Sequence, residues 1–126
     1  MKIKSFRELE VWKLGKTIVA DIYKTTKTFP DDERFGLTTQ MRRCSVSIPS
    51  NIAEGFNRFN NNEYRRFLYI SLGSCAELET QVEIGNDLGY IGQSERDALV
   101  EKLDHESRMI MNLIKKVNEQ RATSNE

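Results

Sequence analysis

The feature that most constrains this chain is a helical apolar pattern that continues through a proline at position 49. Five apolar side chains recur at steps of four, three, four and four, which places them on one face of a helix: Leu37, Met41, Cys44, Ile48 and Ile52. A proline inside a helix removes a hydrogen bond and costs about 3 kcal/mol. Because Ile52 resumes the pattern one turn after Ile48 and no turn residues intervene, we predict one helix over residues 32–56 with a kink at Pro49.

A second row of residues lies nearly opposite this apolar face. It consists of Arg43, Ser47, Ser50 and Glu54. A solvated surface is the ordinary interpretation of such a row. Its middle residues are small enough for another backbone to approach, however, and opposite charges stand at its two ends. We therefore expect this row to contact another copy of the chain.

The same periodicity predicts three further helices. The first should start between residues 5 and 9 and end near residue 28, the third should cover 61–88, and the fourth should start near 94 and end by 120. Four amphipathic helices with short links form an antiparallel up-and-down four-helix bundle, so the predicted fold class is all-α. Residues 1–120 constitute this single domain, and residues 121–126 are expected to be a disordered tail.

Each of these three helices has an expected core face. In the first helix, the main apolar group is Leu9, Trp12, Val19, Tyr23 and Thr26, and a smaller group is Val11, Ile18 and Ile22. In the third helix, the core face is Tyr64, Phe67, Leu68, Ser71, Cys75, Leu78 and Val82, and the opposite face carries Arg66, Ile70, Gly73, Glu77 and Ile84. In the fourth, the core face is Leu99, Leu103, Ile110, Leu113 and Val117. A face that combines isoleucines with glycine and charge suits a contact between subunits, with Glu54 and Glu77 as ion-pair candidates.

Helix ends carry recognisable capping signals. Ser5 and Glu8, and likewise Asn60 and Glu63, have the spacing of a capping box. Gly89 is positioned to end the third helix, because glycine readily adopts the left-handed conformation found at helix C-termini. These signals support the predicted starts of the first and third helices.

Length and composition limit the class of protein further. A chain of 126 residues suffices for one domain with a real core, and it contains no apolar run long enough to span a membrane. The N-terminal residues lack the apolar stretch of a signal peptide, so we expect a cytoplasmic location. Cys44 and Cys75 fall on core faces, where they are expected to remain reduced.

Charge is balanced overall but unevenly distributed. Residues 1–66 carry thirteen basic and eight acidic side chains, a net charge of +5, whereas residues 67–126 carry six basic and eleven acidic ones, a net charge of −5. Such asymmetry is typical of a basic surface for nucleic acid, or of complementary helices that pack together. A net charge of zero argues against strong non-specific binding to nucleic acid.

A search for chemistry finds no catalytic, cofactor-binding or metal-ligating residues, and no site for a small-molecule substrate. His105 is the only histidine, and the two cysteines lack the spacing of a zinc site. Helical bundles that hold two metal ions use Glu-x-x-His motifs, which this sequence does not contain. It also contains no phosphate-binding loop or dinucleotide fingerprint.

Basic residues next to aromatic ones are the candidates for nucleic-acid binding. They are Arg42, Arg43, Arg58, Arg65 and Arg66, with Lys2, Lys4 and Arg7 near the N-terminus. Phe59 and Tyr64 lie close in sequence to three of these arginines. Basic and aromatic side chains together suit phosphate contact and base stacking. In a ring of identical subunits, even a modest patch is repeated, which multiplies its effect.

Several segments resemble the 23S rRNA intervening-sequence protein family. They are residues 6–12, the Phe29-Pro30 pair, residues 33–40, Arg42-Arg43, the proline-containing segment 47–55, residues 72–81 and Asp87-Leu-Gly-Tyr90. The resemblance covers about residues 5–118. It implies a four-helix bundle that assembles into a homopentamer, and a related branch resembles the nucleic-acid-binding accessory protein that partners a reverse transcriptase in diversity-generating retroelements. The sequence differs from that branch in its zero net charge.

Three hypotheses follow for the function. The first is a non-catalytic, oligomeric bundle that binds RNA or a nucleic-acid-handling partner through a repeated basic surface. The second is a protein-interaction scaffold with no nucleic-acid role, which the zero net charge favours. The third is an enzyme, which would require a deep pocket with convergent polar groups.

Overall fold

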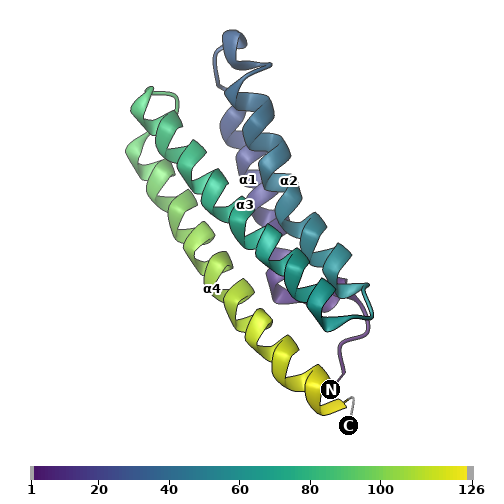
Figure 1. Ribbon diagram of the computed structural model, residues 1–126. Coiled ribbons are helices and arrows are strands. Elements are labelled where there is room, and N and C mark those ends of the chain that lie inside the picture. Colours follow the sequence, from purple (N-terminus) through teal and green to yellow (C-terminus); the bar gives the residue numbers. More distant parts are fainter. Residues whose placement is uncertain (1, 125–126) are drawn as a thin grey trace.

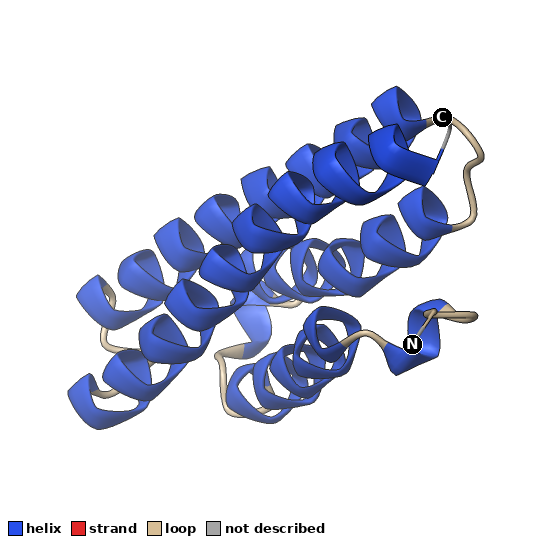
Figure 2. Ribbon diagram, turned by 90° about the horizontal axis from the view of Figure 1, so that it is seen from below, coloured by secondary structure: helices blue, strands red, loops and turns tan. Residues whose placement is uncertain are grey.

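The computed structural model describes residues 2–124, and within them there are helices but no strand (Figures 1 and 2). Four α-helices follow one another along the chain: α1 (Glu10–Thr26), α2 (Leu37–Phe56), α3 (Asn61–Asp87) and α4 (Gln93–Ser124). Two short 3₁₀ helices, η1 (Phe6–Glu8) and η2 (Asp31–Glu33), precede α1 and α2. The predicted all-α fold with four helices is confirmed.

In Figure 1 successive helices run in opposite directions. Each helix packs against the next one in sequence, and α1 also contacts α4, which closes the bundle. Both termini lie at the end of the bundle that also holds the α2–α3 link at residues 57–60 (Figure 1). We call this end the basic end, and the opposite end, formed by the links 27–36 and 88–92, the acidic end, because of the charges described below.

Helix α2 continues through Pro49, as predicted. Four polar side chains donate hydrogen bonds to carbonyls of this helix close to the proline: Ser45 to Arg42, Ser47 to Cys44, Asn51 to Ser47, and Ser71 of α3 to Ile48. The carbonyl that loses its intrahelical partner at Pro49 is that of Ser45, and these four bonds go to carbonyls near it rather than to that group. The bend itself stays a prediction.

The first two helices start later than predicted. The Ser5–Glu8 capping box is present, but it caps the 3₁₀ helix η1, and α1 begins at Glu10. Likewise, the acidic residues 31–33 form η2, and α2 begins at Leu37. The Glu33 carboxylate accepts a hydrogen bond from the Leu37 backbone N–H at 3.1 Å. Helix α2 is thus capped by a residue of the preceding short helix.

The predicted boundaries of α3 agree closely with the structure. The Asn60 side chain accepts hydrogen bonds from the backbone N–H groups of Asn62 (2.7 Å) and Glu63 (3.3 Å). Gly89 has a φ of 81°, in the left-handed region that favours glycine. The chain can therefore reverse directly after α3 and enter α4.

The C-terminal end differs from the prediction. Helix α4 continues to Ser124, so residues 121–124 are helical where a disordered tail was expected. No glycine or proline interrupts residues 93–124, so nothing in the sequence forces an earlier end. Residues 125–126 of the predicted tail lie outside the described residues.

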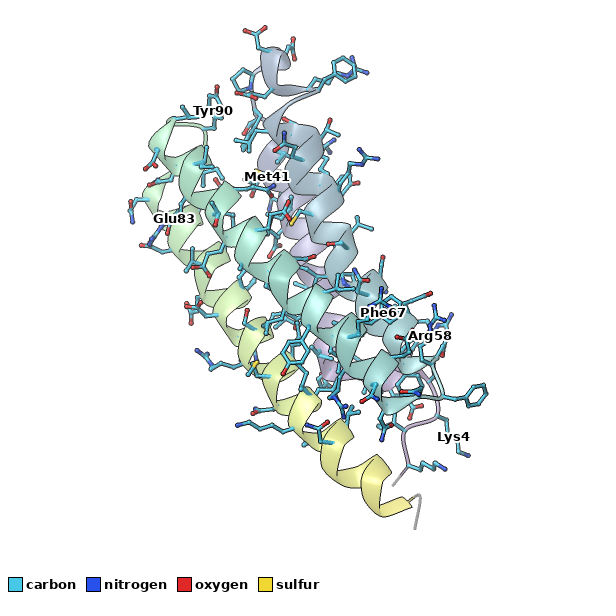
Figure 3. All side chains as sticks on the ribbon, in the orientation of Figure 1. Lys4, Met41, Arg58, Phe67, Glu83 and Tyr90 are labelled. Carbon is cyan, nitrogen blue, oxygen red and sulfur yellow. The ribbon has the colours of Figure 1, made fainter. Side chains whose placement is uncertain are left out.

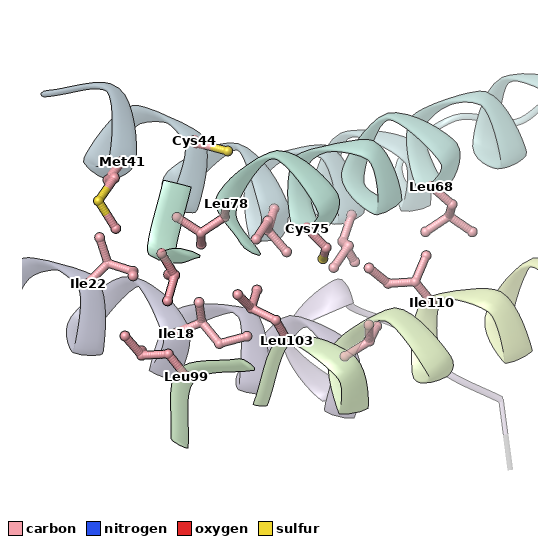
Figure 4. Close-up of a cluster of buried hydrophobic side chains, with 14 of the residues drawn as sticks. Ile18, Ile22, Met41, Cys44, Leu68, Cys75, Leu78, Leu99, Leu103 and Ile110 are labelled. Carbon is pink, nitrogen blue, oxygen red and sulfur yellow. The ribbon is translucent and has the colours of Figure 1, made fainter. Parts of the chain in front are cut away.

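The apolar faces of all four helices meet in one core (Figure 4). For α2, α3 and α4 the predicted faces are confirmed, with Leu37, Phe67 and Leu113 only partly buried. For α1 the smaller predicted group, Val11, Ile18 and Ile22, is fully buried. Of the main group, Thr26 is buried and Leu9 and Trp12 pack against the core, whereas Tyr23 is 42% exposed. The buried set includes Gly15, and with it the steps are four, three and four. The smaller group, completed by Gly15, is therefore the fully buried one.

Candidate nucleic-acid interface

Two arginines flank one aromatic ring at the basic end. The guanidinium carbon of Arg58 lies 5.0 Å from the centroid of the Phe67 ring, and that of Arg66 lies 5.4 Å from it. Arg58 also pairs with Glu54 at 2.7 Å, and Arg66 pairs with Glu63 at 3.5 Å. Figure 3 shows Arg58 and Phe67 close together near this end. Arg58 and Arg66 therefore lie beside an aromatic ring, but this ring is Phe67 and not Phe59 or Tyr64, which the sequence had suggested.

The α2–α3 link brings a further aromatic ring to the same end. Phe59 is fully exposed, with a relative accessibility of 103%. It directly precedes Asn60, the N-cap of α3, where an apolar residue often packs against the fourth residue of the helix. That residue is Tyr64, which is buried and contacts Phe56 instead, at 6.1 Å between ring centroids. The Phe59 side chain is left in solvent.

Arg65 has a different role from its neighbours. Its guanidinium donates hydrogen bonds to the side-chain oxygens of Asn118 in α4 and Asn62 in α3. These contacts join the start of α3 to the end of α4, next to the exposed link. Arg65 therefore supports the site by positioning the two helices, and it contributes its charge to the surface.

Arg42 and Arg43 lie in the other half of the bundle, away from this group. The Arg42 Nε donates to Thr26 Oγ1 at 2.8 Å, and its guanidinium lies 4.6 Å from the Tyr23 ring centroid. Arg42 thus connects α2 to α1, whereas Arg43 is exposed on α2. The structure does not bring the five predicted arginines together: three are at the basic end and two are not.

The chain's charges are segregated along the bundle axis. A layer through the middle of the bundle contains Gly15, Pro49, Cys75 and Glu106, which approach one another. On the basic side of that layer, the described side chains include ten basic and four acidic ones, a net charge of +6. On the acidic side they include eight basic and twelve acidic ones, a net charge of −4. A protein that is neutral overall therefore carries an excess of basic side chains at one end and an excess of acidic ones at the other.

This segregation was only partly visible in the sequence. Dividing the chain in half by number separates acidic from basic residues, but the fold divides every helix in the middle instead. The basic end combines residues 2–14, 50–74 and 107–118. Lys115 and Lys116 near the end of α4 belong to it, and the sequence-based candidates did not include them. Knowledge of the helix directions is sufficient to find them.

The outer face of α3 is open to solvent in the single chain. Ile70 and Ile84 are 41% and 42% exposed, and a Cβ built on Gly73 meets nothing within 4 Å. Tyr69 and Leu88, which were not predicted for this face, are each 54% exposed. Several apolar side chains on one helix are thus without intramolecular cover, which is typical of a surface used for association.

On α2, Ser47 does not lie on an outer face. It is partly buried, and its hydroxyl donates to the Cys44 carbonyl at 2.6 Å and shares a hydrogen bond with the Ser74 hydroxyl of α3 at 2.7 Å. Arg43, Ser50 and Glu54 are exposed. The expected row is therefore divided: Ser47 holds α2 to α3, whereas its other three members face solvent.

A second apolar surface lies between α1 and α2. It is a shallow groove lined by Lys16, Val19, Ala20, Tyr23, Val46 and Pro49. Tyr23 and Val46 are 42% and 40% exposed. The groove and the outer face of α3 belong to different helices and differ in composition, so they are two unlike surfaces.

The middle layer contains a carboxyl group that the sequence analysis overlooked. Glu106 is fully buried on α4, and neither of its carboxyl oxygens has a hydrogen-bond partner among the described residues. A Cβ built on Gly15 would lie 3.0 Å from Glu106 Oε2 and 3.3 Å from Pro49 Cβ, so a larger residue there would require Glu106 or Pro49 to shift. Burial raises the pKa of Glu106 to about 8. The acid is therefore mostly neutral at pH 7.

A signal for Glu106 was present in the sequence. The predicted core face of the fourth helix has an interval of seven between Leu103 and Ile110. Glu106 divides that interval into three and four, the spacing of a core position. Periodicity alone therefore places an acid inside the bundle.

The cysteines and the remaining acidic groups give no sign of a reactive centre. Cys44 and Cys75 are buried and unpaired by disulfides, and burial raises the pKa of each thiol to about 12. Within residues 2–124, no three or more His, Cys, Asp or Glu side chains are grouped so that they could hold a metal ion. None of the helices in this described range is both long and apolar enough to cross a membrane.

The fold and its surfaces define an all-α four-helix bundle protein with one basic end. A family model, 23S rRNA-intervening sequence protein, matches residues 7–112. The chain belongs to this family, and the resemblance inferred from its sequence segments is confirmed.

One solved structure supports the fold independently. It is the crystal structure of a protein with unknown function from the S23 ribosomal protein family of Bacteroides thetaiotaomicron VPI-5482. The two structures are similar with a TM-score of 0.75 over 83% of this chain and 98% of that chain, at 20% sequence identity. At this identity the likeness concerns the fold. No curated protein matches the chain.

Proposed function

We propose that the protein is a non-catalytic, oligomeric four-helix bundle that binds RNA through the basic end. The observation that carries this proposal is the net charge of +6 on one side of the middle layer, together with Phe59, which is fully exposed there. Basic side chains bind phosphates and release counterions, and exposed aromatic rings bind bases. The family name, which refers to inserts in ribosomal RNA, is consistent with an RNA ligand.

We further propose that the subunits form a ring, with five copies as the family resemblance implies. Two unlike apolar surfaces support a ring: the outer face of α3 with Ile70 and Ile84, and the groove between α1 and α2. When one subunit uses one surface and its neighbour uses the other, the contacts are heterologous and close into a ring if the rotation permits. The exposed candidates Arg43, Ser50, Glu54, Gly73 and Glu77 would lie within or beside these contacts.

Ring symmetry strengthens the RNA proposal. Cyclic symmetry gives every subunit the same orientation relative to the ring axis, so all basic ends share one side of the ring. An RNA that contacts two or more subunits then binds with higher avidity than one subunit provides. This compensates for the modest charge of a single end.

A salt series on a structured RNA tests the proposed function. Fluorescence anisotropy would follow binding of an RNA with hairpins and unpaired loops at several salt concentrations from about 50 to 300 mM. We expect log Kd to rise linearly with log salt, with a slope that reflects several phosphate contacts. If no binding occurs at the lowest salt concentration, the proposal is wrong.

A nucleic-acid-handling partner of the reverse-transcriptase type belongs to the first proposal, as an alternative to RNA itself. A second candidate function is a scaffold for a protein partner, with no nucleic-acid role. It is supported by the net charge of zero and by Phe35, which is 89% exposed at the acidic end. The test is affinity purification after nuclease treatment. A defined protein that co-purifies without RNA, and whose binding requires Phe35, would favour the scaffold.

A further inference from the structure

The position of Phe59 makes its exposure informative. Phe59 and Phe35 each directly precede the N-cap of a helix, Asn60 for α3 and Gly36 for α2. Both rings are almost entirely in solvent, at 103% and 89% relative accessibility. Burying a phenylalanine is favourable by a few kcal/mol, so a ring left in water is available to a partner. The two rings differ in the charges near them, which decide the kind of partner.

Around Phe59, the fold holds two cationic groups in place. Arg58 precedes it in sequence, and Arg58 and Arg66 both lie against the Phe67 ring, within 5.4 Å of its centroid. Each arginine also has a carboxylate partner that limits its movement, Glu54 or Glu63. Positively charged groups that are positioned before binding lose less conformational freedom when a phosphate arrives.

The backbone at the start of α3 is not the anion-binding group. A helix N-terminus offers unpaired N–H groups to phosphates. Here the Asn60 side chain already accepts hydrogen bonds from the Asn62 and Glu63 N–H groups, at 2.7 and 3.3 Å. Phosphate contact at this end therefore depends on the arginine side chains.

These observations specify which form of RNA fits. In a paired A-form helix each base is stacked between its neighbours, so an isolated ring has access to a base face only at a helix end. An unpaired nucleotide exposes its base, and its phosphates are flexible enough to reach nearby arginines. A duplex offers this end phosphates alone, and Phe59 would have no partner.

We infer that the basic end recognises unpaired RNA nucleotides, with a base stacked on Phe59 and the adjacent phosphates bound by Arg58 and Arg66. This inference rests on the proposed function and adds the substrate class to it. A duplex-binding protein with the same charge would use its arginines without the ring. The role of Phe59 therefore distinguishes the two modes.

The test compares two RNAs and four proteins. The RNAs are a labelled single strand of about twenty-four nucleotides and a blunt-ended duplex of about twelve base pairs, which has nearly the same number of phosphates and no unpaired nucleotide. The proteins are the wild type, Phe59→Ala, Phe59→Trp and the matched control Phe35→Ala, which removes an equally placed ring at the acidic end. Each variant is first checked for its melting temperature and for its mass in solution.

We expect the wild type to bind the single strand at least about tenfold more tightly than the duplex, since stacking of a base on an aromatic ring has an effect of this size. Phe59→Ala should lose most of that preference with an unchanged salt slope, and Phe35→Ala should retain it. Phe59→Trp should bind the single strand. The RNA should quench the tryptophan fluorescence of this variant more than that of the wild type, which has no tryptophan at position 59.

Other outcomes overturn the inference in distinguishable ways. Equal, salt-dependent binding of both RNAs with no effect of Phe59→Ala would refute the recognition of unpaired nucleotides and leave the proposed function intact. No binding of either RNA would refute both. If Phe59→Ala dissociates the oligomer, the ring lies between copies of the chain, and the inference is wrong.

Discussion

The two ends of the bundle resemble each other in construction but differ in how their charges are used. At the acidic end, Glu33 accepts hydrogen bonds from the Leu37 N–H (3.1 Å) and the Tyr90 hydroxyl (3.0 Å). Its carboxylate joins the α1–α2 link to the α3–α4 link. The Phe29 and Tyr90 rings pack there with centroids 5.2 Å apart. Charge at this end holds the fold together.

A strong ion pair reinforces the same region. Arg96 at the start of α4 pairs with Glu83 of α3 and with Asp97. The Arg96 guanidinium lowers the pKa of Glu83, because it favours the charged form of that carboxyl group. The acidic end thus joins neighbouring helices through its charges.

At the basic end, the corresponding pairs stay close in sequence. Arg58 pairs with Glu54 four residues away, and Arg66 pairs with Glu63 three residues away. Exposed ion pairs between residues this close in sequence contribute little to stability. Similar exposed phenylalanines therefore lie in different surroundings: the ion pair of Arg96 with Glu83 and the bonds of Glu33 join separate segments at the acidic end, whereas Arg58 and Arg66 pair locally at the basic end.

The largest predicted effect concerns the layer between the ends. The pKa of Glu106 is raised from 4.5 to about 8, so its neutral form is favoured in the folded state. The contribution of Glu106 to the free energy of unfolding should be largest below about pH 4.5. It should fall as the pH rises, and it should stay at its low value above about pH 8. Glu106→Gln or Glu106→Met should remove this dependence, which amounts to roughly 4 kcal/mol between about pH 5 and pH 8.

Urea unfolding at several pH values measures the effect. Glu79→Gln is the matched control, because Glu79 is only partly buried and its pKa is raised by burial and by Asp104. We expect this control to change the pH dependence less. An unchanged slope in Glu106→Gln would show that the carboxyl is paired or hydrated in solution. RNA binding by the two ends can be compared at different pH values only after this change in the free energy of unfolding has been measured.

The second prediction concerns the difference in charge between the two ends of the bundle. The double variant Arg58→Ala, Arg66→Ala should bind RNA about tenfold or more weakly at about 0.1 M salt and reduce the salt slope by about two, because two phosphate contacts are lost. Arg34→Ala at the acidic end is the control, since Arg34 also lies beside an exposed ring, 5.5 Å from the Phe35 centroid. Equal losses in both variants would mean that the ends do not differ.

The sequence predicts features that depend on residues close together along the chain better than features that depend on contacts between helices. Helix positions, the cap at Asn60, the turn at Gly89 and the core faces of three helices depend on local patterns, and they are recovered. In α1 the smaller apolar group, Val11, Ile18 and Ile22, is the fully buried one, and Gly15 completes its spacing next to Glu106. A count of apolar residues along a helix does not detect small residues that allow neighbouring helices to approach closely.

The candidate site needed information that single helices do not contain. Arg42 and Arg58 are the same type of residue, and the sequence gives no reason to separate them. In the fold, Arg42 bonds to Thr26 of α1, whereas Arg58 lies at the basic end. Ser47 was assigned to an outer face because the angle between two helices is not encoded in the period of either one. Lys115 and Lys116 join the basic end only through the direction of α4.

The third prediction uses glycines near the two ends. A Cβ on Gly55 would lie 2.9 Å from Phe67 Cβ and 3.1 Å from the Tyr64 carbonyl oxygen, which are held by the backbone. A Cβ on Gly85 would meet Ile91 Cδ1 at 2.7 Å, the flexible end of a side chain. Gly55→Ala should therefore destabilise the fold by about 1–3 kcal/mol.

Gly85→Ala should change stability by less than about 1 kcal/mol, since the gain in helix propensity offsets the movement of Ile91. Thermal and urea unfolding of both variants gives the comparison. If Gly85→Ala is the more damaging of the two, the packing at the acidic end is more rigid than the contacts indicate. RNA binding by Gly55→Ala should also weaken, because Phe67 positions Arg58 and Arg66.

The last prediction has the smallest effect on the folded chain and concerns assembly. A Cβ on Gly73 meets nothing within 4 Å, so Gly73→Leu should leave helicity and the stability of the single bundle within about 0.5 kcal/mol after its helix propensity is taken into account. If the outer face of α3 contacts a neighbour, the same change should reduce the mass in solution to that of a monomer and weaken RNA binding through loss of avidity. Ser47 is unsuitable for this test, because its hydroxyl bonds to Ser74 within the chain. Mass photometry and circular dichroism on one sample separate the outcomes: a retained oligomer would place the contact elsewhere, and a monomeric wild type would leave each basic end to act alone.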